Sequence, residues 1–237
     1  MWCGGEGFRP LRARRTLNRD RAAAELIRGF RQPRITTRES EDVSQAPNVA
    51  HLNAEFPQYP ITVEDKSWVY GVWYCGRSFQ KTKLYGQYPA TFLKRALALF
   101  PDAKDILHCP SGTVERVRGI TVDKVRDAVR CPQVVADACA LPFVDDSFDL
   151  VLSDPPYSDG DAENYGTGHF PLRKVMQEFH RVLHPHGHLG LLHVMAPSFS
   201  IKRWKWVGMI GVVTGTNSRM RLFSIFESLK ESTTRNP

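Results

Sequence analysis

The chain has 237 residues, of which 42% are hydrophobic and 24% charged, and this composition predicts a globular protein of one domain with at most a small appendage. No stretch approaches 18 apolar residues, so we expect neither a transmembrane helix nor a membrane partner. The basic start lacks an apolar signal core, and the five cysteines include no CxxC pair. A reducing, cytoplasmic location is therefore expected rather than a secreted disulfide framework.

The net charge of +7 is concentrated at the two ends of the chain. Residues 1–50 hold ten arginines, no lysine and six acids, a net +4, and residues 195–237 hold seven basic and two acidic residues, a net +5. Residues 51–194 carry a net −2. This distribution favours a polyanionic partner held by the basic flanks, although basic ends that only aid solubility would have the same composition.

The first 50 residues differ from the rest in composition and in the pattern of apolar residues. Thr16–Phe30 could form one basic helix, and the polar run 35–48 after it is typical of a linker. We therefore expect a basic, largely flexible N-terminal segment over residues 1–50, followed by one domain over residues 51–237.

Strand and helix patterns alternate along this domain. An aromatic and β-branched run predicts a strand or strand pair at 68–76, and an amphipathic pattern predicts a helix from Phe92 to Phe100, stopped by Pro101. Short apolar strands are expected at 105–109, 119–123, 133–138, 148–154 and 189–195, with helices at Asp123–Arg130 and Leu172–Leu183. Apolar strands between helices predict a doubly wound α/β domain with a mostly parallel sheet.

Two connections refine this expectation. Only nine residues, Pro110 to Arg118, join the first two of these short strands, so a single turn or a tight loop must replace the usual crossover helix. The runs 206–215 and 219–227 predict a C-terminal antiparallel hairpin.

The tetrapeptide Asp154-Pro155-Pro156-Tyr157 directly follows a buried strand. Ligands of open α/β sheets bind at the carboxyl ends of strands, and two prolines make this loop stiff. A carboxylate and rigid carbonyls can accept both N–H bonds of a planar aromatic amine while the ring of Tyr157 stacks on its face. These acceptors would localise the nitrogen lone pair for attack on a methyl sulfonium, and Asp154 would stabilise the positive charge that develops.

This D-P-P-Y sequence after a strand resembles motif IV of the S-adenosylmethionine-dependent amino-methyltransferases of nucleic acids. The resemblance extends over residues 85–227. "LPFVDDSFDLVLSD" and "EFHRVLHPHGHLGLLHV" are similar to the runs around strands four and five of class I methyltransferases, and the final hairpin resembles their strands six and seven. It implies a Rossmann-like fold and S-adenosyl-L-methionine as cofactor.

The resemblance also implies which residues hold this cofactor. Cys109, Pro110, Ser111 and Gly112 occupy the place of the glycine-rich motif I, although Gly112 is the single glycine there. Asp123 matches the acid that binds the ribose hydroxyls. Asp137 and Ala138 match the position that reads the cofactor's adenine.

The predicted function is methyl transfer to an exocyclic amino group of a nucleobase, with adenine N6 in DNA as the favoured target and nucleic acid as the partner. Two alternatives remain open at this point. One is an RNA enzyme that acts on adenine N6 or guanine N2, which the lack of a recognition insertion favours. The other is a non-catalytic nucleic-acid-binding module on a degenerate fold.

Other motifs have plainer explanations. Five histidines lie within His180–His193, but they lack the convergent ligands of a zinc site, so no metal is expected. The basic and aromatic run Ile201–Trp206 could bind phosphates and bases or pack its tryptophans inward. Tyr85, Gly86 and Tyr88 could close over cofactor or base, as could Tyr165 in the loop after the tetrapeptide.

Overall fold

The computed structural model describes residues 46–58, 60–64, 68–76, 88–114, 118–127, 130–164, 169–214 and 220–231, all within one compact unit, Ser44–Pro237. The expected helix Thr16–Phe30 lies outside the described residues, as do Tyr85, Gly86 and Tyr165. The domain boundary at residue 50 stays a prediction.

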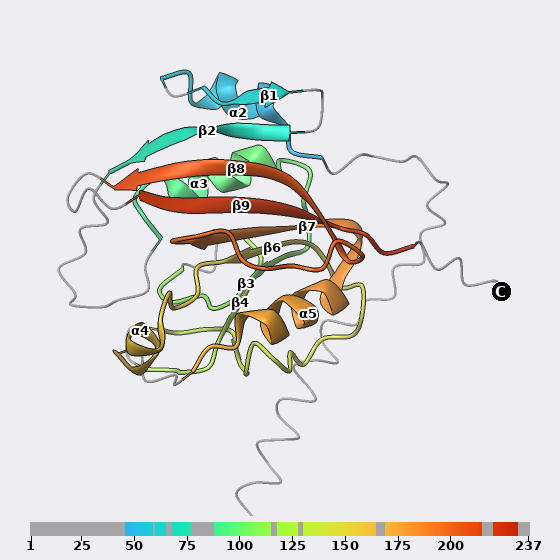
Figure 1. Cartoon of the computed structure of the whole chain (residues 1–237). Helices are drawn as coiled ribbons and strands as arrows, with labels where there is room; N and C mark the ends of the chain where they lie inside the picture. Colours follow the sequence, from blue (N-terminus) through green and yellow to red (C-terminus); the bar gives the residue numbers. More distant parts are fainter. Residues whose placement is uncertain are drawn as a thin grey trace, which may run out of the picture. The chain divides into compact units, whose positions relative to one another are not determined.

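A single nine-stranded sheet forms the centre of the described chain, in the order β1-β2-β8-β9-β7-β6-β3-β4-β5 (Figure 1). The strands are Thr62–Glu64 (β1), Trp68–Cys75 (β2), Ile106–His108 (β3), Ile120–Asp123 (β4), Val134–Val135 (β5), Phe148–Ser153 (β6), Leu183–His193 (β7), Trp204–Thr214 (β8) and Met220–Ser228 (β9). Strands β5, β4, β3, β6 and β7 are parallel to one another, while β9 runs antiparallel to both β7 and β8. The predicted fold class, a mostly parallel doubly wound sheet with a C-terminal antiparallel hairpin, is confirmed.

Helices cover both faces of this sheet. The described helices are Val49–Glu55 (α2), Phe92–Leu99 (α3), Asp159–Asn164 (α4) and Leu172–Val182 (α5). Every residue of β6 is buried, because Leu152 packs in the cluster with Phe92 of α3 while Val151 packs in the cluster with Phe179 of α5. This two-sided burial explains why β6 is mostly apolar, with Leu150, Val151 and Leu152 in succession.

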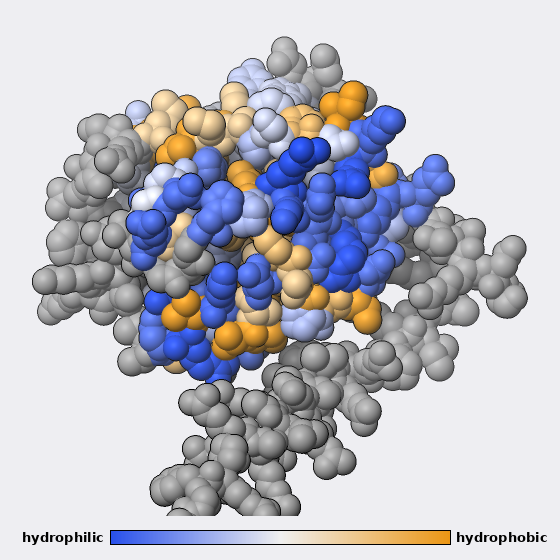
Figure 2. All heavy atoms as spheres, turned by 60° about the horizontal axis from the view of Figure 1, so that its bottom comes forward, coloured by the Kyte–Doolittle hydropathy of each residue, from blue (hydrophilic) through white to orange (hydrophobic). Residues whose placement is uncertain are grey.

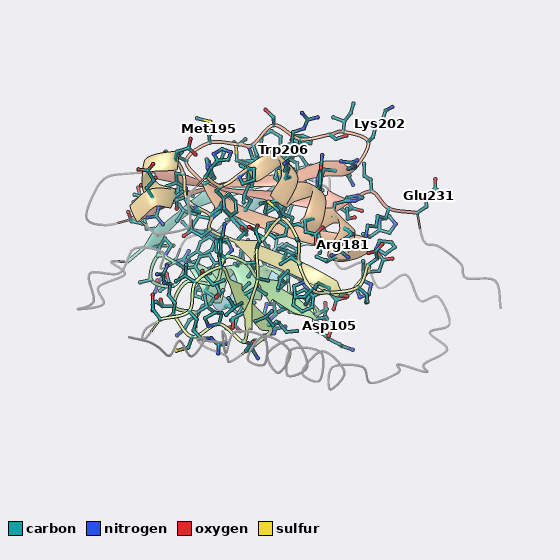
Figure 3. All side chains as sticks on the ribbon, turned by 90° about the horizontal axis from the view of Figure 1, so that it is seen from below. Asp105, Arg181, Met195, Lys202, Trp206 and Glu231 are labelled. Carbon is teal, nitrogen blue, oxygen red and sulfur yellow. The ribbon has the colours of Figure 1, made fainter. Side chains whose placement is uncertain are left out.

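The strand directions define two edges of the sheet. We call the edge where β3, β4, β6 and β7 end the carboxyl edge, and the edge where they begin the amino edge. Since β8 is antiparallel to β9 and β9 to β7, β8 also ends at the carboxyl edge. Met195 follows β7 at the carboxyl edge and Lys202 precedes β8 at the amino edge, and the two lie at opposite ends of Figure 3.

The expected helix Asp123–Arg130 is wrong for the residues that the structure describes there. Asp123 ends β4, residues 124–127 are irregular, and Arg130 is not helical. Asp127 Oδ1 accepts from Arg130 N, which a helix over these residues would bond to the carbonyl of Arg126, and Asp123 Oδ1 accepts from Val125 N. Such local bonds compete with helix formation.

Two further segments differ in detail from the sequence expectations. The link after β3 begins with a single turn, closed by Val114 N donating to Ser111 O, as its shortness required. The strand expected from residue 189 begins earlier, at Leu183, directly after α5. The extra residues are accommodated by an irregularity opposite Phe148 and by His186, whose φ is 60°.

The described surface is mixed rather than uniformly polar. On the face in Figure 2 hydrophilic residues predominate, with smaller groups of hydrophobic residues between them. Larger apolar side chains are exposed on β2, where Val72 is 44% and Tyr74 57% exposed. Among the described helices, none has the length and apolar character that a bilayer span requires.

Candidate active site

A cavity lies at the carboxyl edge of the sheet, where β3, β4 and β6 end side by side. Every residue that the sequence assigned to the cofactor lines it, and Asp154 and Pro156 line it as well. Parallel pairing explains this gathering, because β4, β3 and β6 are neighbours that run in the same direction. The residues lining the cavity that sequence reasoning named are Tyr88, Cys109, Pro110, Ser111, Gly112, Asp123, Asp137, Ala138, Asp154 and Pro156.

The turn after β3 is held by the acid that ends β4. Gly112 N donates to Asp123 Oδ2 at 3.0 Å, and the Asp123 side chain is buried. The φ of Gly112 is 51°, in the left-handed region that glycine adopts without strain. Each carboxylate oxygen has two lone pairs, so Asp123 keeps acceptor capacity for hydroxyl groups of a ligand.

Two buried hydroxyls in the cavity wall lack a hydrogen-bond partner among the described residues. They are Ser111 Oγ, in the turn after β3, and the hydroxyl of Tyr88, just before α3. An unpaired buried polar atom costs free energy, so atoms of this kind at a cavity wall fit a polar ligand that would bond to them. Together with the Asp123 carboxylate, they fit the amino-acid and ribose groups of S-adenosyl-L-methionine.

Asp137 lies at the exposed rim of the same cavity. Its Oδ1 accepts from Cys139 N at 2.9 Å, and its Oδ2 lies 3.2 Å from Lys124 Nζ. The backbone bond from Cys139, followed by the bond from Lys124, holds the pKa of Asp137 below its ordinary value. Ala138 beside it is buried. The carboxylate is therefore ionised and oriented, although half of each side chain in the ion pair is exposed.

Asp154 is the second largely buried acid of the site, after Asp123, with 10% of its side chain exposed. Burial raises its pKa to about 6, against the opposing effects of Arg221 and of the Tyr157 hydroxyl. The Tyr157 hydroxyl donates to Asp154 Oδ1, and Arg221 lies 3.7 Å from Oδ2. The acid that the sequence placed at the reacting centre therefore titrates close to neutral pH.

The rest of the tetrapeptide separates two cavities. Pro155 is buried, and Pro156 lines both the main cavity and a smaller one beside it. The smaller cavity is lined by Pro156, Tyr157, Ser158, Asp159, Phe170, Leu172 and His193. Tyr157 makes an edge contact with His193, with ring centroids 5.2 Å apart. The tetrapeptide thus faces the main cavity with Asp154 and the smaller cavity with Tyr157.

Sequence reasoning missed several residues of the cavity wall. Phe170, Pro171 and Val175 belong to the start of α5, and Cys139 and Lys124 follow strand ends. The position of Lys124 and Cys139 directly after strands could have indicated them, because carboxyl ends of strands line such sites. The start of α5 carries no comparable signal in the sequence.

The basic and aromatic run Ile201–Trp206 does not lie with these residues. It precedes and begins β8, on the side of the sheet where Lys202 lies in Figure 3. Trp204 is buried, Trp206 stacks on Phe226, and Lys205 pairs with Glu227. Inward packing of the tryptophans, the plainer of the two interpretations, therefore describes this run.

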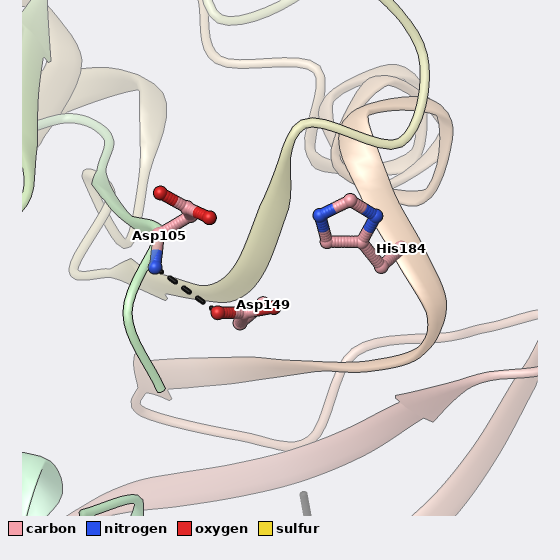
Figure 4. Close-up of side chains that lie close together, drawn as sticks. All are labelled: Asp105, Asp149 and His184. Atoms are coloured by element: carbon pink, nitrogen blue, oxygen red, sulfur yellow. Dashed lines mark hydrogen bonds between the residues drawn. The ribbon is translucent and has the colours of Figure 1, made fainter. Parts of the chain in front are cut away.

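The histidines between 180 and 193 are similarly dispersed, but one of them approaches two acids. His184 lies with Asp105 and Asp149 at the amino edge, with one potential ligand atom of each within 4.8 Å of the others (Figure 4). Asp149 Oδ2 accepts from Lys104 N and Asp105 N at 2.9 and 3.1 Å. These backbone bonds account for the position of Asp149, and we assign the group a structural role in anchoring the start of β3.

Comparisons with known proteins address the same segment of the chain. Residues 115–191, about a third of the chain, match the family model of a methyltransferase domain. No curated protein matches the chain. Among solved structures, the candidate methylase HI0767 from Haemophilus influenzae is 12% identical, with a TM-score of 0.33 over 66% of this chain and 80% of that one. TrmN from Thermus thermophilus is 22% identical, with a TM-score of 0.23 over 40% of this chain and 27% of TrmN.

At these TM-scores the two structures add nothing to the sequence match, which stands on its own. The matched residues run from the loop before β4 to β7, and they include Asp123, Asp137 and the whole D-P-P-Y tetrapeptide. The sheet order and direction fit a Rossmann-like methyltransferase. Residues 115–191 are therefore similar to a methyltransferase domain, and the cofactor that this match indicates is S-adenosyl-L-methionine.

Proposed function

We propose that the domain transfers a methyl group to the exocyclic amine of a nucleobase, with adenine N6 in DNA as its target. The observation that carries this proposal is the position of Asp154-Pro155-Pro156-Tyr157. The tetrapeptide follows β6, with Asp154 in the wall of the main cavity and Tyr157 in the wall of the smaller one. Acceptors beside the cofactor and a ring beside a second cavity are what an aromatic amine requires.

The chain's own groups can prepare this amine for reaction. The carboxylate of Asp154 and the carbonyl of Pro155 accept its two N–H bonds, which localises the lone pair on nitrogen. When bound, S-adenosyl-L-methionine supplies an electrophilic methyl group, and the C–S bond breaks as the N–C bond forms. Asp154 then stabilises the positive charge on nitrogen and can take the proton that leaves, because its pKa of about 6 suits an acceptor near neutral pH.

The smaller cavity supports a base as the group that carries the amine. A base inside a duplex cannot reach a buried carboxylate, so it must leave its stack and be held in a pocket. Tyr157 and His193 give that cavity two aromatic rings from neighbouring elements, and Pro156 joins it to the main cavity. Stacking on such rings stabilises a base of any sequence.

The choice of DNA rests on the form of the tetrapeptide, and the choice of a polyanion rests on charge. The D-P-P-Y form resembles that of the adenine-N6 enzymes. The basic flanks supply the charge that a nucleic acid needs, with ten arginines in residues 1–50. Part of the C-terminal excess has local partners instead: Lys205 pairs with Glu227 and Lys230 with Asp146. The N-terminal arginines are therefore our candidate for nucleic-acid contact.

One labelling experiment tests the proposal. The full chain is incubated with radiolabelled S-adenosyl-L-methionine and separate pools of DNA and RNA, which are then digested to identify the methylated nucleoside. We expect N6-methyladenine from DNA, lost in Asp154→Ala and retained in Asp102→Ala, an exposed acid at the amino edge. Methylated adenine or guanine from the RNA pool alone would show that the substrate is RNA and not DNA. No label in either pool would contradict nucleobase methylation. If calorimetry also detected no cofactor binding, the chain would be a non-catalytic nucleic-acid-binding module.

A further inference from the structure

We propose that Arg221 of β9 is a positioning residue of this site, which keeps Asp154 in its acceptor form and holds Tyr157 against it. This inference rests on the proposed function, because it assigns a role in preparing the acceptor of the amine. Arg221 lies 67 residues after Asp154 in the chain and outside the segment that matches the family model. Neither the sequence motifs nor the family match assigned it a role.

The geometry places three side chains in one closed group. A guanidinium nitrogen of Arg221 lies 3.7 Å from Asp154 Oδ2, and the guanidinium carbon lies 5.3 Å from the centroid of the Tyr157 ring. The Tyr157 hydroxyl closes the group by donating to Asp154 Oδ1. Each carboxylate oxygen thus faces a different partner, and the cation faces both the acid and the ring.

The fold brings Arg221 to this position through strand pairing. Leu222 of β9 pairs with His193, the last residue of β7, so β9 begins at the carboxyl edge. Side chains two apart on a strand share a face, and Phe223 packs in the same cluster as Leu152 of β6. Arg221 lies two residues before Phe223, and Asp154 lies two residues after Leu152. Both side chains therefore lie on that face, at the carboxyl edge of the sheet.

Electrostatics explains why the acid needs this cation. A buried carboxylate tends to take up a proton, and a protonated Asp154 would donate a hydrogen bond where the amine requires an acceptor. The titratable and charged groups around it are Arg221 of β9, Tyr157 of its own loop, Tyr88 before α3, His193 of β7 and Cys75 of β2. Burial raises the pKa of Tyr88 and Cys75 and lowers that of His193, so these groups are neutral at pH 7. Arg221 supplies the positive charge of the group.

The ring contact gives Arg221 a second effect. Tyr157 contacts both the guanidinium of Arg221 and the ring of His193, which come from neighbouring antiparallel strands. A cation over a ring face attracts it, so Arg221 fixes the ring that is proposed to stack on the base. Loss of Arg221 is therefore expected to affect both the protonation of Asp154 and the orientation of Tyr157.

The test measures the titration of Asp154 directly, so it does not depend on methyl transfer. The chain is labelled with ¹³C-carboxyl aspartate, the Asp154 signal is identified by its loss in Asp154→Asn, and its titration is followed from pH 4 to 9. We expect the midpoint to move upward by about one unit or more in Arg221→Gln, since a close opposite charge lowers a carboxyl pKa by that amount. Arg221→Lys should bring the titration midpoint of Asp154 most of the way back to that of the unaltered chain. Lys205→Gln removes a cation at the amino edge and should change nothing.

The rate of methyl transfer provides the second readout. In Arg221→Gln the acidic limb of the kcat/KM profile should move upward with the titration midpoint, and Arg221→Lys should restore it. An unchanged Asp154 midpoint in a folded Arg221→Gln variant would overturn the positioning role, whatever the rates show. If the unaltered chain methylates no nucleic acid, the proposed function fails, and the titration of Asp154 alone then decides the role of Arg221.

Discussion

The hydroxyl of Tyr157 donates a hydrogen bond of 2.5 Å to Oδ1 of Asp154, three residues earlier in the same tetrapeptide. The residue expected to stack on the target and the residue expected to accept its amine are therefore coupled before any target binds. Because the hydroxyl bonds to the ionised form of the acid, it lowers the pKa of Asp154 and opposes the effect of burial.

Tyr157→Phe separates the two roles of this side chain. The ring remains available for stacking, but the hydrogen bond to Asp154 is lost, so the pKa of Asp154 should rise above about 6. The acidic limb of kcat/KM for methyl transfer should move to higher pH, while the rate at pH 8.5 changes by less than about tenfold.

The matched control for this change is Tyr70→Phe, which removes a hydroxyl from an exposed tyrosine of β2. Its pH profile should follow that of the unaltered chain. Tyr157→Ala removes the ring as well and should lower the rate at every pH. A Tyr157→Phe profile that coincides with the original one would show that the hydroxyl does not influence Asp154 during the reaction.

Asp154→Asn should remove the pH dependence of stability that this acid imposes. The folded pKa of about 6 exceeds the ordinary value of 3.8, so the stabilising effect of protonation is complete below pH 4 and is lost as the pH rises through 6. A shift of about two units corresponds to about 3 kcal/mol. Between pH 4 and 7.5, the free energy of unfolding of Asp154→Asn should therefore rise relative to the original chain by up to about 3 kcal/mol.

Urea unfolding at a series of pH values measures this difference. Asp102→Asn, which changes an exposed acid at the amino edge, serves as the control and should give parallel curves. Parallel curves for Asp154→Asn as well would mean that the acid is not held at a raised pKa in the folded chain.

Asp123→Asn should weaken cofactor binding more than the same change at Asp137. The Asp123 carboxylate accepts from Gly112 N and from Val125 N, whereas an amide offers one oxygen and turns its NH₂ group toward the other donor. We expect a loss of roughly 1–3 kcal/mol in stability and a fall of tenfold or more in affinity. Calorimetry with S-adenosyl-L-methionine gives the affinities. Asp137 lies at the exposed rim, so Asp137→Asn should retain more binding; equal losses would contradict the anchoring role of Asp123.

The positions of the acids at the strand ends could be predicted from the sequence because the signals are local. Asp154 follows a mostly apolar run, in which Asp149 and Ser153 are the polar residues, and such a run indicates a strand buried on both faces, which ends at the ligand-binding edge. Asp123 and Asp137 follow shorter runs of the same kind. The sheet direction then brings all three acids to one cavity, as expected.

Other features depended on contacts that no local pattern encodes. Arg221 reaches Asp154 through the pairing of β9 with β7. The helix expected after Asp123 fails for a related reason: its propensity is adequate, but the Asp123 and Asp127 carboxylates bond to the backbone instead. The basic run at 201–206 has the composition of a nucleic-acid contact, but Trp204 is buried, Trp206 is partly buried against Phe226, and the run begins β8 at the amino edge.

Gly190 of β7 should tolerate no side chain. A Cβ atom there would lie 2.7 Å from the ring of Phe223 and 2.9 Å from Leu152, both on strands that pair with β7. Gly190→Ala should lower the free energy of unfolding by about 1–3 kcal/mol, since overpacked cores must shift. Gly160→Ala, where the nearest atom is 3.9 Å away, is the control and should have little effect. Equal stability of the two variants would show that the sheet can shift at this point to accommodate the added methyl group.

Removal of residues 1–45 should weaken nucleic-acid binding and flatten its salt dependence. This segment holds ten arginines against six acids, and the deletion leaves Val49, which packs in the domain core. Each phosphate contact that is lost lowers the slope of log K against log salt by about 0.9, so several lost contacts would be plain between 50 and 200 mM salt. Fluorescence anisotropy with a labelled duplex measures both quantities. Lys202→Gln with Arg203→Gln removes two exposed cations at the amino edge, away from Asp154, and should leave the slope nearly unchanged. An unaltered slope in the deletion would show that the arginine-rich segment does not contact the nucleic acid.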